Sequence, residues 1–297
     1  MKRVLVTGAG SYIGETVRQY LEQWPEKYSV TTVGTKKGEW KEISFHSFDA
    51  VYHVAGLAHA DLGRISKKKI NQYYTVNTEL AIKVAEKAKE EGAGQFIFMS
   101  SAIVYGDSAP IGMDKVITAQ TPCSPSNYYG DSKVQAEKGL MDLSDSTFRV
   151  VLLRCPMIYG KNAKGNFRFL KILGRKLPVF PKVENARSML YEKNLAEFVR
   201  LMIENKEAGI FWPCNREWSN TSELVKMIAE FNGKRILLLP GFSGLLKRLG
   251  HMTGYIDKAF GNLAYEKGLG DYKEEYRLYS LRESIAEIEG TNGNAER

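Results

Sequence analysis

The sequence predicts an α/β fold in which a doubly wound parallel sheet carries a smaller C-terminal lobe. Short β-branched runs typical of buried strands alternate with amphipathic helical patterns over about the first 160 residues. A glycine-rich turn joins the first strand to the first helix, and the alternation becomes irregular after Gly160. A length of 297 residues, of which 43% are hydrophobic, is enough for one large domain with such a lobe.

The first strand–turn–helix unit predicts a binding site for a dinucleotide. Lys2 to Thr7 has the pattern of a buried strand, and Gly14 to Trp24 that of an amphipathic helix. The turn between them is Gly8-Ala9-Gly10-Ser11-Tyr12-Ile13-Gly14. Glycines at this place let backbone N–H groups and the helix N-terminus approach a pyrophosphate, although an ordinary tight turn is the alternative.

The second strand, Ser29 to Val33, ends without the acidic residue that usually binds the adenosine ribose of NAD. It runs instead into Gly34-Thr35-Lys36-Lys37. These lysines suit the 2′-phosphate of NADP, which we slightly favour over NAD, but two solvated loop lysines would look the same. The span from Glu39 to Ser47 is short, so the third strand of such folds is expected to be abbreviated.

The next two strands bring small and hydroxyl residues to the edge of the sheet where doubly wound folds bind ligands. Ala50 to Val54 ends in His53-Val54-Ala55-Gly56, and a long helix from Asn71 to Glu91 carries Asn77. Gln95 to Met99 is a strand that leads into Ser101. Ser101 suits a hydrogen bond to a substrate oxygen, and a serine that caps a turn is the alternative.

Tyr129 and Lys133 are the candidate proton-transfer pair. Residues four apart lie on one face of a helix, and Tyr128 is turned away from that face. A cation beside a phenol stabilises the phenolate, so we expect Lys133 to lower the pKa of Tyr129.

The C-terminal part is less regular. Arg149 to Arg154 is a strand, and helices are predicted at Asn194 to Glu204, at Ser222 to Phe231 and around Leu245 to Leu263. Thr291 to Arg297 is predicted to be a disordered tail.

Composition excludes several classes of protein. No stretch approaches the roughly 20 apolar residues of a membrane span, and the start resembles no signal peptide. Cys123, Cys155 and Cys214 have no metal-binding spacing and suit a reducing cytoplasm, where we expect the protein to lie. The net charge of +8 could steer an anionic substrate, although a lysine-rich surface explains most of it. We expect no metal and no nucleic-acid partner.

Several motifs in the right order resemble an extended short-chain dehydrogenase/reductase. They are Thr7-Gly8…Gly14, His53 to Gly56, Asn77, Ser101 to Gly106, Tyr129…Lys133 and Arg154…Pro156…Tyr159-Gly160. Within that group, Gly165-Asn166-Phe167, Leu177-Pro178 and Arg187 to Tyr191 look like the nucleotide-sugar 4-epimerases and 4-ketoreductases of bacterial surface-polysaccharide synthesis. The resemblance covers about residues 2 to 205 well.

The resemblance implies roles for individual residues. Ser101, Tyr129 and Lys133 would be catalytic, with Asn77 supporting Lys133 through water. Asn166 and Arg187 would bind the diphosphate and uridine of a UDP-sugar beside Ser101 and Tyr129. The residues expected to hold the cofactor are Gly8, Ser11, Tyr12, Ile13, Gly14, Thr35, Lys36, Lys37, Val54, Ala55, Gly56, Tyr129, Lys133 and Pro156. Ser11 replaces the middle glycine of the family's turn, and its small hydroxyl can still donate to a phosphate.

The same resemblance implies a Rossmann-type domain over residues 1–160, joined by 186–215, and a substrate lobe formed by 161–185 and 216–290. It implies a homodimer that acts with NAD or NADP at C4 of a UDP-hexose. We expect a UDP-4-keto-sugar reductase, with a UDP-glucose 4-epimerase type of enzyme as the alternative and a non-catalytic dinucleotide sensor as a remote one. Ala102 and Ile103 stand where a dehydratase has an Asp-Glu pair, which disfavours dehydration.

Overall fold

The computed structural model describes residues 1–57, 65–242, 244, 246–248 and 255–290. Its centre is a six-stranded sheet in the order β10-β6-β4-β3-β1-β2, and every neighbouring pair is parallel. The strands are β1 (Lys2–Thr7), β2 (Tyr28–Val33), β3 (Ala50–His53), β4 (Gln95–Ser101), β6 (Arg149–Cys155) and β10 (Gly209–Phe211). The predicted doubly wound parallel sheet is confirmed.

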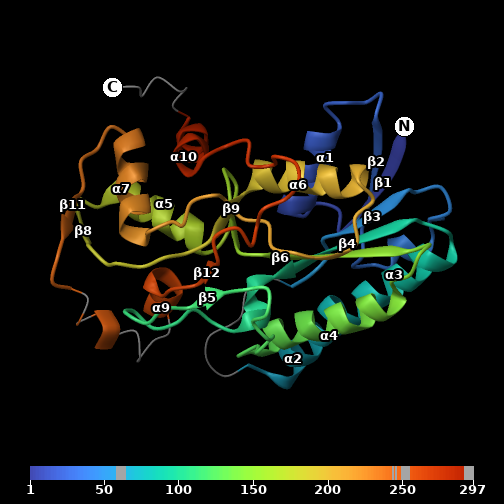
Figure 1. The fold of residues 1–297 in the computed structure, drawn as a ribbon, viewed down its shortest axis with the longest axis horizontal. Helices are drawn as coiled ribbons and strands as arrows, with labels where there is room; N and C mark the ends of the chain where they lie inside the picture. The colour runs from blue at the N-terminus through green and yellow to red at the C-terminus, as the bar shows by residue number, and fades with distance from the viewer. Residues whose placement is uncertain (58–64, 243, 245, 249–254, 291–297) are drawn as a thin grey trace.

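Helices cover both faces of the sheet (Figure 1). On one face lie α1 (Tyr12–Leu21) and α6 (Glu192–Glu204), which pack on β1 and β6 through a common apolar cluster. On the other lie α2 (Lys67–Tyr73), α3 (Leu80–Glu90) and α4 (Tyr128–Leu143). Because both faces are covered, the central strands are apolar on both sides, and Val4, Leu5 and Val6 are all fully buried.

The chain crosses from one side of the sheet to the other between β1 and β3, which are neighbours. Residues 34–49 contain no strand and only a 3₁₀ turn, η1 (Glu39–Lys41). The expected shortening of the third strand is therefore complete, and β2 is the edge of the sheet. Ligands of doubly wound sheets bind at such a crossover, beyond the carboxyl ends of the strands.

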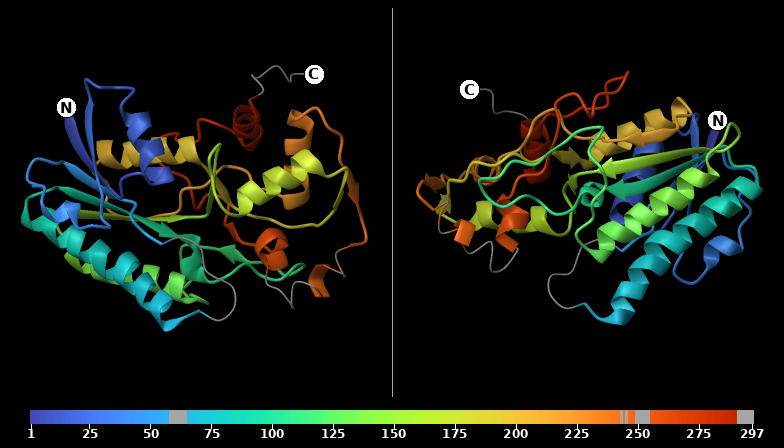
Figure 2. Two further views of the ribbon diagram at one scale, coloured as in Figure 1. Left: turned by 180° about the vertical axis from the view of Figure 1, so that it is seen from behind. Right: turned by 60° about the horizontal axis from the view of Figure 1, so that its bottom comes forward.

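A second body of the chain lies beside these carboxyl ends (Figures 1 and 2). Among its helices are α5 (Asn166–Lys176), α7 (Thr221–Phe231), α9 (Tyr255–Phe260) and α10 (Leu281–Glu289). Three two-stranded parallel pairs complete it: β7 (Met157–Tyr159) with β9 (Met189–Tyr191), β8 (Val179–Pro181) with β11 (Leu237–Leu239), and β5 (Val116–Ile117) with β12 (Ala264–Tyr265). The pairing of β5 with β12 ties the chain after the fourth strand to this body.

Some predicted elements differ from the observed ones. The predicted long helix begins at Lys67 and is interrupted by a π-helical segment, η2 (Tyr74–Glu79). Within the predicted helix around 245–263, residues 246–248 and α9 (Tyr255–Phe260) are helical, whereas residues 261–263 are not. The predicted tail, residues 291–297, lies outside the described residues. None of the helices in the described ranges has the length and apolar character needed to cross a membrane.

Candidate active site

The glycine-rich turn after β1 is a close fit to its surroundings. Gly8 has φ +108°, and a Cβ there would lie 2.8 Å from the backbone nitrogen of Ala55. A Cβ on Gly14 would lie 2.9 Å from a methyl carbon of Val54. Both glycines therefore let the turn, helix α1 and the loop after β3 approach more closely than any side chain would allow. This cradle of backbone at a helix N-terminus fits the pyrophosphate of a dinucleotide.

Ser11 begins helix α1 as its N-cap, because its hydroxyl oxygen accepts a hydrogen bond from the Gly14 N–H at 3.2 Å. The hydroxyl hydrogen is still able to donate. The N–H groups of Tyr12 and Ile13 lie in the first turn of α1, where a helix supplies no carbonyl for them. The Tyr12 ring packs instead against the C-terminal body, and burial followed by the neighbouring Glu192 carboxylate raises the pKa of its phenol. Tyr12 thus offers its backbone N–H to this turn.

The loop after β2 contains an acidic group that sequence reasoning missed. Lys36 and Lys37 are exposed after Gly34 and Thr35. The Glu39 carboxylate folds back over Gly34, and all three of its carboxyl atoms lie 3.0–3.1 Å from the position of a Cβ on Gly34. The Lys37 N–H also donates to Glu39 Oε2 at 3.1 Å. No sequence signal pointed to Glu39, because it follows the strand by six residues and only the folded turn brings it back.

The loop after β3 lies directly against the first turn. The N–H groups of Val54 and Ala55 both donate to the Thr7 carbonyl at 3.1 Å. A Cβ on Gly56 would lie 3.2 Å from Asn77 Oδ1 and 3.5 Å from Lys133 Nζ. The two predicted groups, the small residues after β3 and the Asn77–Lys133 pair, are therefore brought together.

Asn77 lies inside the π-helical segment and is fully buried. Its amide accepts from the Leu57 N–H at 2.7 Å and donates to the Leu57 carbonyl at 3.2 Å and to the Ser132 hydroxyl at 3.0 Å. Ser132 in turn donates to the carbonyl of Tyr129 at 2.8 Å. Asn77 thus fixes the loop after β3 to the helix that carries the candidate catalytic tyrosine.

Ser101 ends β4, and Tyr129 projects from the first turn of α4. Asn127 caps that helix by accepting from the Gly130 N–H at 2.9 Å. Burial raises the pKa of Tyr129 to about 12, and a hydrogen bond with Ser101 opposes this rise. The two hydroxyl groups therefore lie together, as the sequence predicted.

The expected influence of Lys133 on Tyr129 is not found in this structure. The Lys133 ammonium donates to the Met99 carbonyl at 2.7 Å and lies 4.3 Å from the centroid of the Phe98 ring. Burial raises the pKa of Tyr129, and the charge of Lys133 is not among the influences that oppose this rise. Burial lowers the pKa of Lys133 itself to about 8.

Buried His53 lies close to this lysine. Its Nδ1 is 2.7 Å from the Thr7 hydroxyl, and its ring stacks with Phe96 and Phe98. Burial, then the charge of Lys133, lowers the pKa of His53 to about 3. The histidine is thus a neutral packing residue.

A buried ion pair behind Ser101 was also missed. Arg154 on β6 donates to Glu137 on α4 at 2.7 Å, and the Ser100 hydroxyl donates to the same carboxylate. Arg154 also donates to the Tyr105 hydroxyl at 2.7 Å. Two signals for the pair were present, because Glu137 lies one helical turn after Lys133 and Arg154 is the register partner of Ser100. The pair fixes the end of the strand on which Ser101 stands.

Three of the predicted site residues follow β6 in the chain: Pro156, Asn166 and Arg187. The surroundings of Arg187 say most about the site. Arg187 is 9% exposed, and its guanidinium donates to the Gly261 carbonyl at 2.8 Å and to the Ser108 hydroxyl at 3.2 Å. Burial lowers the pKa of Arg187 to about 10, and no ion pair to it is found within the described ranges. Asn166 is exposed at the start of α5, and Pro156 is buried between β6 and β7.

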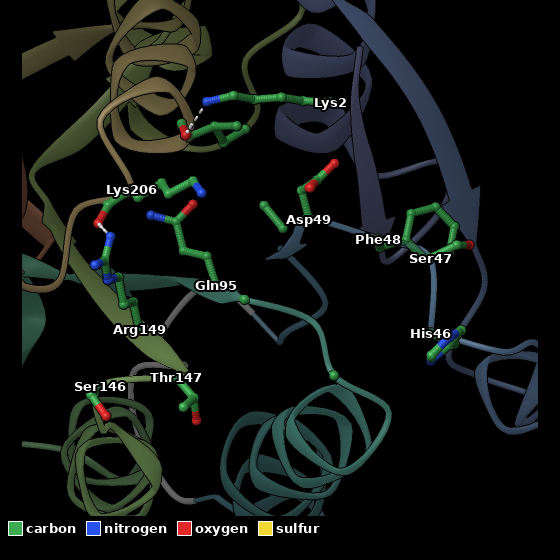
Figure 3. A pocket seen from close by; sticks show the side chains of 14 residues that line it. Lys2, His46, Ser47, Phe48, Asp49, Gln95, Ser146, Thr147, Arg149 and Lys206 are labelled. Carbon is green, nitrogen blue, oxygen red and sulfur yellow. Dashed lines mark hydrogen bonds between the residues drawn. The ribbon is translucent and has the colours of Figure 1, made fainter.

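A hollow of about 400 Å³ lies at the opposite, amino-terminal edge of the sheet (Figure 3). Two of the cations that line it have partners: Lys2 donates to the Ile203 carbonyl at 2.8 Å, and Arg149 to the Lys206 carbonyl at 2.9 Å. These residues stabilise the end of α6, and none of the predicted site residues lines the hollow.

The parallel sheet, the glycine-rich first turn and the Ser101–Tyr129–Lys133 arrangement define the class of extended short-chain dehydrogenases/reductases. The chain belongs to the NAD dependent epimerase/dehydratase family, whose model matches residues 4–211. It is 29% identical to the UDP-glucose 4-epimerase of Vibrio cholerae over 75% of this chain and 70% of that protein.

Solved structures of other proteins share the fold, and two of them serve as examples. One is UDP-glucuronic acid 4-epimerase from Bacillus cereus in complex with NAD, at a TM-score of 0.73 and 17% identity, covering 97% of this chain and 96% of that one. The other is dTDP-4-dehydrorhamnose reductase from Bacillus anthracis in complex with NADP, at 0.72 and 18%, covering 97% and 99%. The family and fold expected from the sequence are confirmed.

Proposed function

We propose that this protein is an NAD(P)-dependent oxidoreductase that acts at C4 of a UDP-hexose, in the direction of 4-ketosugar reduction. The observation that carries the proposal is the shared position of the Ser101 and Tyr129 hydroxyls, with Lys133 one helical turn along α4. A hydroxyl pair of this kind suits one substrate oxygen that changes between carbonyl and alkoxide.

Each residue has a distinct part in this chemistry. The bound nicotinamide would supply hydride to the carbonyl carbon. Tyr129 rests as the neutral phenol, since the pKa of its hydroxyl is about 12, and donates its proton to the oxygen as negative charge develops there. Ser101 donates a hydrogen bond to the same oxygen and steadies it. Lys133, whose ammonium donates to the Met99 carbonyl, would provide a positive charge one helical turn from Tyr129 on α4.

Arg187 supports an anionic substrate. Arg187 has no carboxylate partner in the described ranges, and burying an unpaired guanidinium costs folding free energy unless a bound anion neutralises its charge. A diphosphate supplies such an anion and matches the fork of the guanidinium. Ser108, which contacts Arg187, lies seven residues after Ser101 on the same segment. In this proposal Arg187 holds the diphosphate, and Asn166 at the start of α5 contacts the uridine.

The division of the chain follows the same proposal. Residues 1–160 with 186–215 would bind the cofactor, and 161–185 with 216–290 would bind the sugar. The same proposal includes a cytoplasmic location, a homodimer, and a substrate that is a precursor of surface polysaccharide. Sedimentation analysis would test the dimer.

UDP-hexose 4-epimerisation is the second candidate, favoured by the relative from Vibrio cholerae. An epimerase would use Tyr129 twice, first to accept the C4 hydroxyl proton and then to return it. Ala102 and Ile103 provide no acid or base after Ser101, which still disfavours dehydration.

Substituting Tyr129 by Phe tests the mechanism. We expect kcat to fall by about 10²- to 10⁴-fold, the usual value of a positioned proton donor, while cofactor binding stays within about twofold. Tyr128→Phe, at an exposed position on the same helix turn, is the matched control and should leave kcat unchanged. Full activity in Tyr129→Phe would refute the proposed role.

Nucleotide released from denatured protein distinguishes the candidates. Stoichiometric tightly held NAD together with interconversion of UDP-glucose and UDP-galactose would identify an epimerase. Oxidation of added reduced nicotinamide by a UDP-4-ketosugar would identify the reductase. If no nucleotide-sugar changes the redox state of the cofactor, the non-catalytic sensor would be the remaining candidate.

A further inference from the structure

Glu39 occupies the place that an acidic residue at the end of β2 would occupy in an NAD-binding sheet of this type. Gly34, the first residue after β2, has no side chain, and the Glu39 carboxylate fills the volume where one would begin. The contact is face-on, because Cδ, Oε1 and Oε2 are all within 3.0–3.1 Å of that Cβ position.

The surrounding structure fixes the carboxylate there. Gly38 adopts the left-handed conformation at φ +85° and starts the η1 turn. Trp40, the next residue after Glu39, is only 6% exposed and packs in the same apolar cluster as Val33 at the end of β2. The Lys37 N–H holds Oε2 at 3.1 Å, which leaves Oε1 able to accept another hydrogen bond.

The end of β2 is also joined to the glycine-rich turn. The N–H groups of Gly8 and Ala9 donate to the Val33 carbonyl at 2.9 and 3.0 Å. A dinucleotide whose pyrophosphate lies on that turn brings its adenosine ribose to the end of the second strand, where an acid accepts from the ribose hydroxyls. A 2′-phosphate at the same place would meet a like charge.

We propose that Glu39 is the adenosine-ribose acceptor of this chain and makes it selective for NAD(H) over NADP(H), with Lys36 and Lys37 as solvated surface residues. The inference rests on the dinucleotide site of the proposed function but not on its sugar chemistry. It also separates the choice of cofactor from the choice between reductase and epimerase.

Direct binding tests the inference without turnover. Fluorescence titration with NADH and NADPH should give the wild-type protein at least tenfold tighter binding of NADH, or about 1.4 kcal/mol. Glu39→Ala should weaken NADH binding about tenfold and reduce the ratio of the two affinities to near one. Glu42→Ala removes the same charge from an exposed position three residues on and should change neither affinity. Lys36→Ala/Lys37→Ala should likewise leave the ratio unchanged.

Moving the acid provides the sharper test. Gly34→Asp alone places a second carboxylate against Glu39 and should weaken NADH binding. The double variant Gly34→Asp/Glu39→Ala frees that volume and should restore the NADH preference. Circular dichroism would verify that each variant is folded.

Three outcomes would overturn the inference: tighter binding of NADPH by the wild type, loss of that binding in the lysine variant, or an unchanged ratio in Glu39→Ala. If the ratio shifts as expected but no UDP-sugar reacts, the inference on Glu39 stands and the proposed reaction fails.

Discussion

The buried pair Glu137–Arg154 allows a quantitative prediction of stability, because the hydrogen bonds of each side chain are defined. The two side chains are 6% and 10% exposed, and three of the hydrogen-bond contacts between them measure 2.7–3.2 Å. Glu137→Gln keeps the shape but leaves the Arg154 cation buried without its counter-charge. Breaking such a pair from one side costs about 4 kcal/mol.

That cost converts into a measurable change in Tm. An unfolding entropy of about 2 cal/mol/K per residue gives about 0.6 kcal/mol/K for 297 residues. Glu137→Gln should therefore lower Tm by about 7 °C. Glu86→Gln, exposed on the neighbouring helix α3, is the control and should change stability by less than about 0.5 kcal/mol.

Removing both charges should cost less than removing one. In Glu137→Met/Arg154→Met no uncompensated charge remains, and only the hydroxyls of Ser100 and Tyr105 lose partners, at about 1 kcal/mol each. Urea unfolding of the two single variants and the double variant would measure the coupling. A double variant as unstable as the sum of the single ones would refute the reasoning.

Two further predictions concern buried cations. Because burial lowers the pKa of Lys133 from 10.5 to about 8, the unfolded chain binds more protons between these values. The free energy of unfolding should therefore rise with pH from about 8 to 10.5. Urea unfolding of Lys133→Met across this range should show a smaller rise. If the wild type and the variant have parallel pH profiles, the prediction is wrong. Arg187→Met should stabilise the free protein or leave it unchanged, since the cation has no counter-charge in the described ranges, but should abolish the rise in Tm that UDP produces in the wild type. An equal rise in Tm with UDP would exclude Arg187 from the diphosphate site.

Much of the fold was predictable because its signals are local. The β-branched runs of β1, β3, β4 and β6 and the turn from Gly8 to Gly14 need only neighbouring residues to be recognised. The pairing of Ser101 with Tyr129 was predictable from motif order. The carboxyl ends of parallel strands share one edge, so a helix starting near that edge brings its first turn to it.

The missed features depend on contacts between distant segments. Glu39 reaches Gly34 only because η1 folds the chain back, and the ammonium of Lys133 is held by the carbonyl of Met99 on another element. Helical spacing alone predicted that Lys133 would act on the phenol of Tyr129. It could not show that a strand carbonyl competes for the same ammonium.

The π-helical segment Tyr74–Glu79 changes the spacing of the buried residues around it. Tyr73, Asn77, Ala81 and Ala85 are all buried, at intervals of four. Three turns of a regular α-helix take about 11 residues, whereas these three intervals take twelve. One extra residue is therefore absorbed without turning the buried face away from the sheet. Deleting any one residue between Tyr73 and Ala85 would rotate the first turns of this helical run by roughly 100° relative to the rest. The helical run thus has a fixed length as well as a fixed pattern, and tolerance to single-residue deletion should be lowest where Asn77 lies.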